Sequence, residues 1–231
     1  FNQHNNPINS LSDSIFTTSY IYENKVGNHT VSRYVDFSYL PASHLLRSDN
    51  KEFLSESELK IGETKIRINL DNGNAELREL TLYSVTSLVP NRKIKSELSG
   101  YFNFGYKHTY DNLLRDDGYV FIEAGLGKTI KIHRDIMAYG IINTGLGVRK
   151  NNTKLNFQPK IGAIFKIIGN LKVNLEASHE FNNNISSIIR KEKFSIVWNR
   201  YKTMSLSADF EKISLGIKKS KNISFNLDYY F

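Results

Sequence analysis

The stretch KNISFNLDYYF, residues 221–231, alternates between apolar and polar side chains. From Ile223 onward every odd position is apolar or aromatic, and the even positions are polar as far as Asp228. Successive side chains of a β-strand point to opposite faces, so a period of two indicates a strand with one apolar and one polar face. A helix would place these apolar residues on no single face.

The same alternation recurs along the chain and predicts an all-β protein. A hairpin turn is expected at Asp71–Asn74, where Asn72-Gly73 separates two alternating runs. About twelve antiparallel strands are expected, near residues 14–23, 30–40, 58–70, 75–88, 97–108, 118–132, 136–149, 154–167, 171–181, 189–200, 203–212 and 221–231.

The stretch AGLGKT, residues 124–129, ends like a phosphate-binding loop. Such a loop needs a first glycine five residues before the second, and Ile122 stands there instead. Residues 144–149, TGLGVR, repeat the glycines without Lys-Thr. In both segments the glycines fall on the polar side, where they leave room for neighbouring side chains or let the sheet bend. We therefore interpret AGLGKT as a strand turning at its end and Lys128 as an ordinary rim charge.

Composition limits the possible functions of the 231 residues. The chain has no cysteine, which excludes disulfides, cysteine-ligated zinc and a cysteine nucleophile within this segment. Its longest uncharged apolar run, residues 136–142, is too short for a membrane-spanning helix. The net charge of +8 is compatible with nucleic acid, anionic lipid headgroups or lipopolysaccharide as a partner, and equally with lysines scattered over a basic protein. No spacing typical of metal ligands occurs, and we expect neither a cofactor nor a nucleic-acid partner.

Two environments fit many alternating strands. A barrel of about twelve strands is too wide to be filled by aliphatic side chains, because about eight strands already enclose a packed core. If the wide barrel closes, its charged face lines the interior and its apolar face meets lipid. A soluble sandwich or ligand-binding barrel would reverse these faces. We favour the transmembrane barrel in the bacterial outer membrane, with an aromatic girdle that includes Tyr20, Tyr22, Tyr39, residues 101–106 and residues 229–231.

Two features resemble known families. The aromatic ending with terminal Phe looks like the C-terminal assembly signal of outer-membrane barrels, carried here by Leu227, Tyr229 and Phe231. Residues 37–46, FSYLPASHLL, and 76–90, ELRELTLYSVTSLVP, are similar to the C-terminal β-domain of Lnb-type proteins, which are associated with lipoprotein N-acylation. The chain has Leu40 where that family has Arg, and it lacks the Asp that follows the family histidine.

The resemblance implies a division of labour. A preceding periplasmic domain would carry cysteine-dependent acyl transfer, and residues 13–231 would form one barrel domain that anchors it, with residues 1–12 as linker. This segment itself is then not an enzyme. The partners implied are outer-membrane lipid and lipopolysaccharide, the barrel-assembly machinery, and the chain's own N-terminal periplasmic domain.

Candidate functional residues follow from the faces and from the resemblance. His44 lies in the family-like stretch and is the candidate binding residue. His108 and His179 fall on apolar parity near strand ends, where a lipid-modifying barrel enzyme would need a Ser-His pair. A polar channel is the other alternative. The charges expected in the lumen either line a pore or pair across it, and we favour pairing; they are Glu123, Arg149, Lys160, Lys172, Glu176, Asp209, Glu211 and Asp228.

Overall fold

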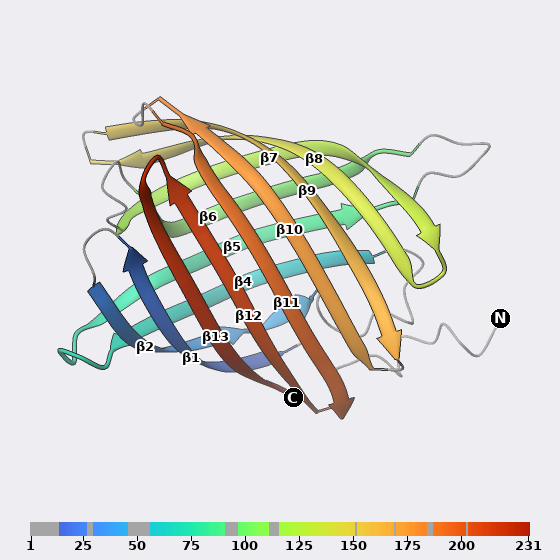
Figure 1. Cartoon of the computed structure of the whole chain (residues 1–231), viewed down its shortest axis with the longest axis horizontal. Coiled ribbons are helices and arrows are strands. Elements are labelled where there is room, and N and C mark those ends of the chain that lie inside the picture. The colour runs from blue at the N-terminus through green and yellow to red at the C-terminus, as the bar shows by residue number, and fades with distance from the viewer. Residues whose placement is uncertain are drawn as a thin grey trace.

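The computed structural model describes residues 14–26, 30–45, 56–90, 97–110, 116–150, 152–168, 170–183, 187–201 and 203–231. Every regular element in these ranges is a β-strand (Figure 1). The strands are β1 (Ile15–Val26), β2 (Thr30–Leu40), β3 (Ala42–His44), β4 (Glu56–Asn69), β5 (Ala75–Leu88), β6 (Ser99–Tyr110), β7 (Asp116–His133), β8 (Ile136–Arg149), β9 (Asn152–Ile168), β10 (Leu171–Asn182), β11 (Ile189–Tyr201), β12 (Met204–Leu215) and β13 (Lys218–Tyr230).

The strands close into an antiparallel barrel. Each strand from β4 to β13 pairs with its sequence neighbours, β13 pairs with β1, and β2 pairs with β4. Because β2 and β3 both run along β4 and are separated only by Pro41, they act as one interrupted strand. The barrel therefore has twelve strands around its circumference and no free sheet edge, and such closure lets backbone groups pair within the sheet, as hydrocarbon requires.

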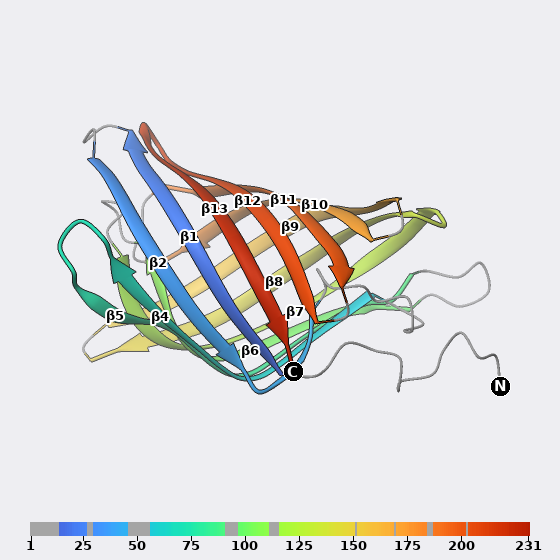
Figure 2. The ribbon, with the colours of Figure 1, turned by 90° about the horizontal axis from the view of Figure 1, so that it is seen from below.

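The first and last strands meet along their whole length. β1 pairs with β13 from Ile15 opposite Tyr230 to Val26 opposite Lys219. The start of β1 and the end of the chain consequently share one rim (Figure 2). We call this the periplasmic rim, because outer-membrane barrels are inserted from the periplasm and keep both ends of the barrel there. The hairpins at Asp71–Asn74 and at Gly216 lie on the opposite, extracellular rim.

The extracellular hairpin between β4 and β5 closes as a tight turn. Gly73 adopts a positive φ of 74°, which explains the Asn-Gly signal, and its N–H donates to the Asn69 carbonyl. Asp71 accepts two hydrogen bonds from the Arg33 guanidinium and one from the Arg33 backbone N–H. These contacts hold the pKa of Asp71 below its usual value. The hairpin is thus fixed to β2.

The apolar face of the sheet points outward. On β13, Ile223, Phe225, Leu227 and Tyr229 are 40–60% exposed, whereas Asn226 and Asp228 between them are buried inside. The same division holds on the long strands β7 to β9, where Leu126 and Ile161 are more than 60% exposed. A soluble barrel would show the reverse. In the described part of the chain, no helix has the length and apolar character needed to cross a membrane.

All twelve expected strands are present, and three details differ. β3 was not expected, because the break at Pro41 interrupts the alternation. AGLGKT does not end a strand but lies inside β7, which continues to His133. Tyr230 and Tyr101 do not join an aromatic girdle: Tyr230 is 2% exposed and packs inside, and the Tyr101 hydroxyl donates to Glu123 in the lumen. The expected linker, residues 1–12, lies outside the described residues.

Candidate functional site

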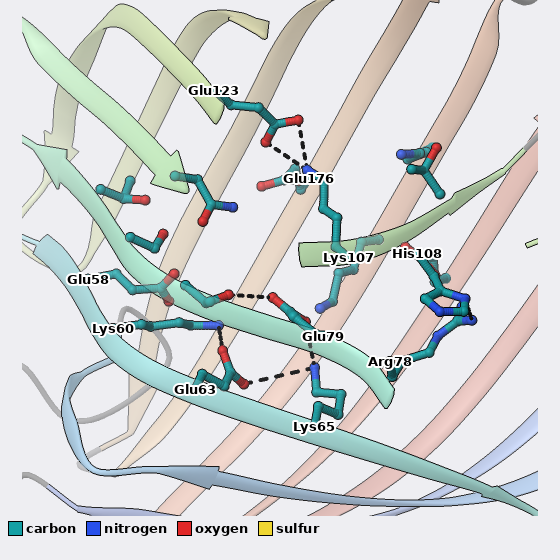
Figure 3. A pocket seen from close by; sticks show the side chains of 18 of the residues that line it. Glu58, Lys60, Glu63, Lys65, Arg78, Glu79, Lys107, His108, Glu123 and Glu176 are labelled. Carbon is teal, nitrogen blue, oxygen red and sulfur yellow. Dashed lines mark hydrogen bonds and ion pairs between the residues drawn. The ribbon is translucent and has the colours of Figure 1, made fainter. Parts of the chain in front are cut away.

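The lumen encloses a polar cavity of about 680 Å³. Among the described residues, nine acidic side chains and nine Lys or Arg side chains line it, so their formal charge is balanced. The charges come from nearly every part of the wall, because every inward strand position alternates with a lipid-facing one. Figure 3 shows some of these side chains converging from β4, β5 and β6. The acidic and basic side chains are interleaved along the wall, and their arrangement determines what the cavity can hold.

On β4 and its neighbours the charges form a continuous chain of ion pairs. Lys60 Nζ lies 3.0 Å from Glu63 Oε2, and Lys65 Nζ lies 3.1 Å from Glu79 Oε2 (Figure 3). Nearby, the Arg67 guanidinium donates two hydrogen bonds of 2.8 and 2.9 Å to Asp36 of β2. This bidentate pair joins β2 to β4 where the two strands are hydrogen-bonded, so it also strengthens their contact.

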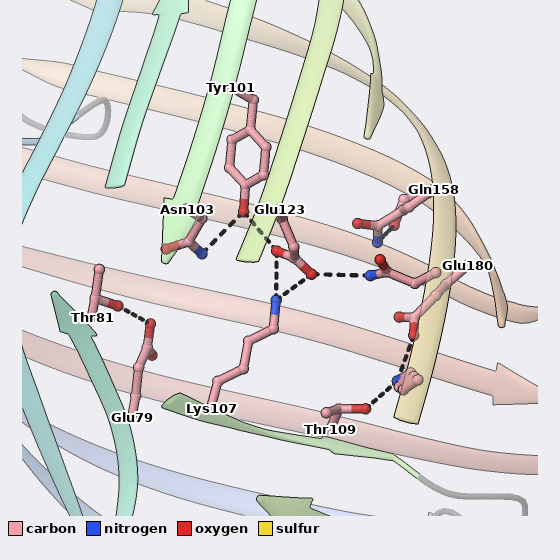
Figure 4. Close-up of polar contacts among 12 residues, drawn as sticks. Glu79, Thr81, Tyr101, Asn103, Lys107, Thr109, Glu123, Gln158 and Glu180 are labelled. Carbon is pink, nitrogen blue, oxygen red and sulfur yellow. Dashed lines mark hydrogen bonds and ion pairs between the residues drawn. The ribbon is translucent and has the colours of Figure 1, made fainter. Parts of the chain in front are cut away.

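Glu123 is the centre of a second network, shown in Figure 4. Its two carboxylate oxygens each lie 2.7 Å from Lys107 Nζ, and they also accept hydrogen bonds from Tyr101 and Asn156. The carboxylate is 6% exposed, and these four hydrogen bonds satisfy it. A buried charge with this many donors is held in one position rather than left available for chemistry.

Glu180 of β10, beside the Glu123 network, holds two lysines (Figure 4). Lys154 and Lys191 both approach its carboxylate at 2.8 Å, from β9 and β11. Lys154 also contacts the Thr109 hydroxyl of β6, three strands away, and Lys160 lies over the Tyr101 ring. These two side-chain contacts reach from β9 to β6 and narrow the lumen between the two strands.

The remaining ion pairs follow the wall. Each joins residues of the same strand or of adjacent strands, including Lys160 with Glu176 and Lys193 with Asp209. These charges were expected to form ion pairs across the lumen. In the described part of the chain they form ion pairs along the wall instead. Adjacent strands place side chains of one face about 5 Å apart, whereas opposite walls lie beyond the reach of most side chains. The central cavity is left for water as a result.

Glycines of β7 and β8 make room for the polar side chains. A Cβ added to Gly125 would collide with the Asn143 side chain, and one added to Gly145 would collide with Glu123 and Asn156. Because the glycines of the repeated G-L-G stretches have no side chain, they leave space at the inner wall for the side chains of the Glu123 network. Their function is steric, and no phosphate-binding loop is formed.

An apolar cluster, which we call the periplasmic plug, lies inside the barrel at the periplasmic end of the lumen. Leu88 is fully buried and packs with Met137, Ile141 and Ile164 from β8 and β9. The chain then turns inward, so that Pro90 forms a bridge with Thr129 of β7. Thr129 is itself fully buried. The first residues after β5 thus lie against the inner face of β7 at this end of the barrel.

A second apolar cluster lies on the other side of the same rim. Ile15, Leu40, Leu45 and Tyr230 pack together, each 4% exposed or less. Asp228, which is fully buried, accepts hydrogen bonds of 2.7 Å from Thr17 and 2.9 Å from Ser205. Apolar and hydrogen-bonded polar side chains are therefore packed together at this end of the lumen.

The structure divides the expected lumen charges into three groups. Glu123, Lys160, Glu176, Asp209 and Glu211 line the cavity. Lys172 and Asp228 face inward but are buried near the periplasmic end. Arg149 lies at the extracellular rim, half-exposed, and pairs with Asp117 at 2.6 Å.

The histidines form no catalytic pair among the described contacts. The backbone of His44 lies in β3 opposite Leu59, and its side chain is outside the described residues. His108 contacts the Arg78 guanidinium at 3.1 Å and the Tyr106 hydroxyl at 3.0 Å. His179 is exposed on the outer wall. No group of three His, Cys, Asp or Glu residues in the described ranges is arranged to hold a metal ion.

Sequence reasoning missed the charges of β4 and β5, and the reason is local. Lys60 and Glu63 both line the cavity, so the alternation shifts by one residue between them. The shift occurs at Gly62, which has a positive φ of 74°. A strict period of two places Lys60 and Glu63 on opposite faces. The glycine was the one available signal, since strand glycines often mark such irregularities.

The closed wall, the outward apolar face and the polar lumen define an outer-membrane β-barrel protein. Solved barrels of this class share the fold at low sequence identity. An outer membrane channel from Pseudomonas putida F1 aligns at 6% identity over 100% of this chain and 99% of its own, with a TM-score of 0.61. The NanC porin aligns at 6% over 93% and 99%, with a TM-score of 0.54. The transport unit of the Escherichia coli autotransporter AIDA-I aligns at 13% over 100% and 93%, with a TM-score of 0.50.

Residues 19–230 match the family described as a domain of unknown function, DUF7840, and the chain belongs to that family. A sequence comparison with curated proteins finds no match. The protein is therefore a DUF7840 barrel located in the outer membrane.

Proposed function

We propose that this barrel is a membrane anchor that positions a periplasmic domain at the outer membrane, rather than an open pore. The observation that carries the proposal is the packed periplasmic mouth. Leu88 and Ile164 fill one side, Ile15 and Tyr230 fill the other, and all four are 2% exposed or less. A membrane anchor needs a stable, sealed barrel wall and no passage for solutes through the lumen.

The position of the first strand supports the same role. β1 begins at the periplasmic rim, beside the end of β13. A domain preceding the barrel would therefore be delivered to the periplasmic side, close to the membrane surface. Pro41 and Leu45, from the family-like stretch 37–46, lie at this rim as well, where such a domain would sit.

The resemblance to Lnb-type β-domains supplies the identity of that domain in the proposal. The preceding domain would perform cysteine-dependent acyl transfer on lipoproteins, and the barrel would contribute placement and no catalysis. The barrel-assembly machinery would insert the chain by its C-terminal strand. His44 would contact the attached domain, since its backbone lies at the periplasmic rim.

The anchor role can be tested with a reporter. A periplasmic reporter enzyme fused before residue 1 should fractionate with the outer membrane and resist protease added to intact cells. The fusion should become sensitive once the outer membrane is permeabilised. Recovery of the reporter in the soluble periplasm, or its digestion on intact cells, would contradict the proposal.

The chemistry is tested separately. The 231-residue chain, reconstituted with phospholipid and a diacylated lipoprotein, should leave the lipoprotein N-terminus unmodified by mass spectrometry. The full-length protein should add one acyl chain in the same assay. Acylation by the barrel alone would instead support the lipid-modifying alternative.

A polar channel is the second candidate, because a cavity of about 680 Å³ remains and solved relatives in fold include a channel and a porin. Planar bilayer recordings separate the two. The anchor predicts no discrete current steps for the native chain and new steps for a Leu88→Ser/Met137→Ser double variant, which opens the plug. Steps in the native chain would establish the channel, and a Glu123→Gln variant should then shift its ion selectivity.

A further inference from the structure

Exposed cations gather on the outer wall of β11 to β13, close to the extracellular rim. Arg190 lies at the start of β11, and Lys219 and Lys221 lie at the start of β13; all three are exposed. Lys212 of β12 faces Lys221 directly across the strand pair, and Ser214 lies between Arg190 and Lys219. We call these four residues the rim cation cluster. The three strands are adjacent in the sheet (Figure 1), so these cations lie on one patch of the outer wall.

The rim cation cluster carries uncompensated charge. Like charges directly opposite each other on a sheet are destabilising. Its nearest carboxylate, Glu192, pairs with Lys212 at 2.9 Å. Within the described ranges, Arg190, Lys219 and Lys221 have no carboxylate within ion-pair distance. By contrast, Arg33 on the same rim is neutralised by Asp71 at 2.7 Å. The described residues of β11–β13 therefore carry a surplus of positive charge, which suits an anionic ligand.

An apolar groove of about 730 Å³ crosses the outer wall beside the cluster. Its floor consists of small residues, Ala138, Gly140, Ala163 and Ala177, of which Ala138 and Ala163 are direct cross-strand partners. Leu175 and Phe194 rise beside them. The groove ends at Glu192 and Phe210, next to Lys212. The groove begins next to a site for a charged headgroup and continues along the lipid-facing wall. This arrangement fits an acyl chain.

We propose that this surface binds lipopolysaccharide of the outer leaflet, with its phosphates on the rim cation cluster and one acyl chain in the groove. The extracellular rim faces the leaflet that contains this glycolipid. Three separated cations match a headgroup with more than one phosphate better than a phospholipid with one. The site is on the outer wall, so this proposal does not depend on whether the lumen conducts ions.

The test uses the whole chain, purified in detergent, and native mass spectrometry with bisphosphorylated lipid A as the probe. The native protein should retain lipid A. An Arg190→Gln/Lys219→Gln/Lys221→Gln variant should bind it about 100-fold more weakly, since each cation near an anionic surface contributes on the order of a tenfold factor or slightly less. A Lys131→Gln/Arg134→Gln/Lys150→Gln variant removes the same charge elsewhere and should bind like the native protein.

Two further comparisons separate the parts of the site. Dephosphorylated lipid A should bind the native protein as weakly as bisphosphorylated lipid A binds the cation variant. An Ala177→Phe variant, which fills the groove, should lose affinity severalfold while its cations remain. Heat-modifiable gel migration establishes that each variant is folded. Equal binding by the native and cation variants, equal binding of both lipid A forms, or preferential retention of phosphatidylglycerol would overturn the proposal.

Discussion

At the scale of single residues, Asp228 shows how a charge is kept inside the barrel. It occupies a polar position in an aromatic-rich strand, yet it is fully buried and accepts hydrogen bonds from Thr17 and Ser205. These donors come from β1 and β12, on either side of β13. Asp228 therefore links three strands near the periplasmic rim.

Replacing Asp228 by Ala should destabilise the folded barrel by about 1–3 kcal/mol, because two buried hydroxyls lose their acceptor. Asp228→Asn keeps an acceptor oxygen and should cost less. Urea unfolding in lipid vesicles, followed by tryptophan fluorescence, measures both variants. An Ala variant as stable as the native protein would show that water replaces the carboxylate without loss.

Gly105 provides a steric test. A Cβ added there would collide with the Leu80 carbonyl oxygen, whereas one added to Gly100 of the same strand meets nothing within 4 Å. Gly105→Ala should lower stability by roughly 1–3 kcal/mol, since backbone must shift to accept it. Gly100→Ala should change it by less than about 1 kcal/mol. The same unfolding assay compares them, and equal effects would contradict the close approach of β5 and β6.

The Arg33–Asp71 contact predicts a pH response at the extracellular hairpin. The pKa of Asp71 is lowered in the folded state, chiefly by hydrogen bonds from Arg33, so its contribution is present above the unfolded pKa. The contribution is lost as pH falls through the lowered value. Arg33 side-chain NMR signals should stay constant from neutral pH to about 4 and shift only in more acid solution. Asp71→Asn should abolish the shift, and an unchanged shift in that variant would assign it to another group.

At the scale of elements, the end of β13 tests the predicted assembly signal. Phe231 stacks on Tyr39 and Tyr229, at centroid distances of 6.3 and 5.8 Å. Phe231→Ser should reduce the amount of assembled barrel in outer-membrane fractions severalfold. Phe225→Ser makes the same change on the same face, in mid-strand, and serves as the control. Equal losses would mean that aromatic packing, rather than the terminal position, determines assembly.

The extent of sequence-based prediction is also visible in the elements. β13 and β10 were predictable because their alternation is unbroken, and the strands on either side of Asn72-Gly73 because the turn is explicit. β3 and the lumen face of β4 were not, since Pro41 and Gly62 interrupt the period without showing where it resumes. Ion-pair partners were out of reach as well: Lys107 meets Glu123 only through strand register, which single strands do not encode.

At the scale of the whole molecule, the outward apolar surface determines the solvent. Large apolar side chains such as Phe225, Leu126 and Ile161 are 60–66% exposed. The chain should therefore refold from urea into detergent micelles or lipid vesicles and fail to fold in plain buffer. Heat-modifiable gel migration and circular dichroism check this. A monomeric β-protein in buffer would contradict the outward facing of these residues.

The pairing of β1 with β13 also has a consequence for how the molecule is made. Thr17 and Asp228 touch across a separation of 211 residues, so the ring closes only between the two ends of the sheet. Such non-local contacts form late and slowly, after a large loop-closure entropy has been met. Until then both edge strands offer unpaired backbone groups to any other chain. This protein therefore most needs a chaperone in the interval between secretion and closure of the barrel. A chain that stops folding before its last strand is added has no smaller closed barrel as a stable intermediate.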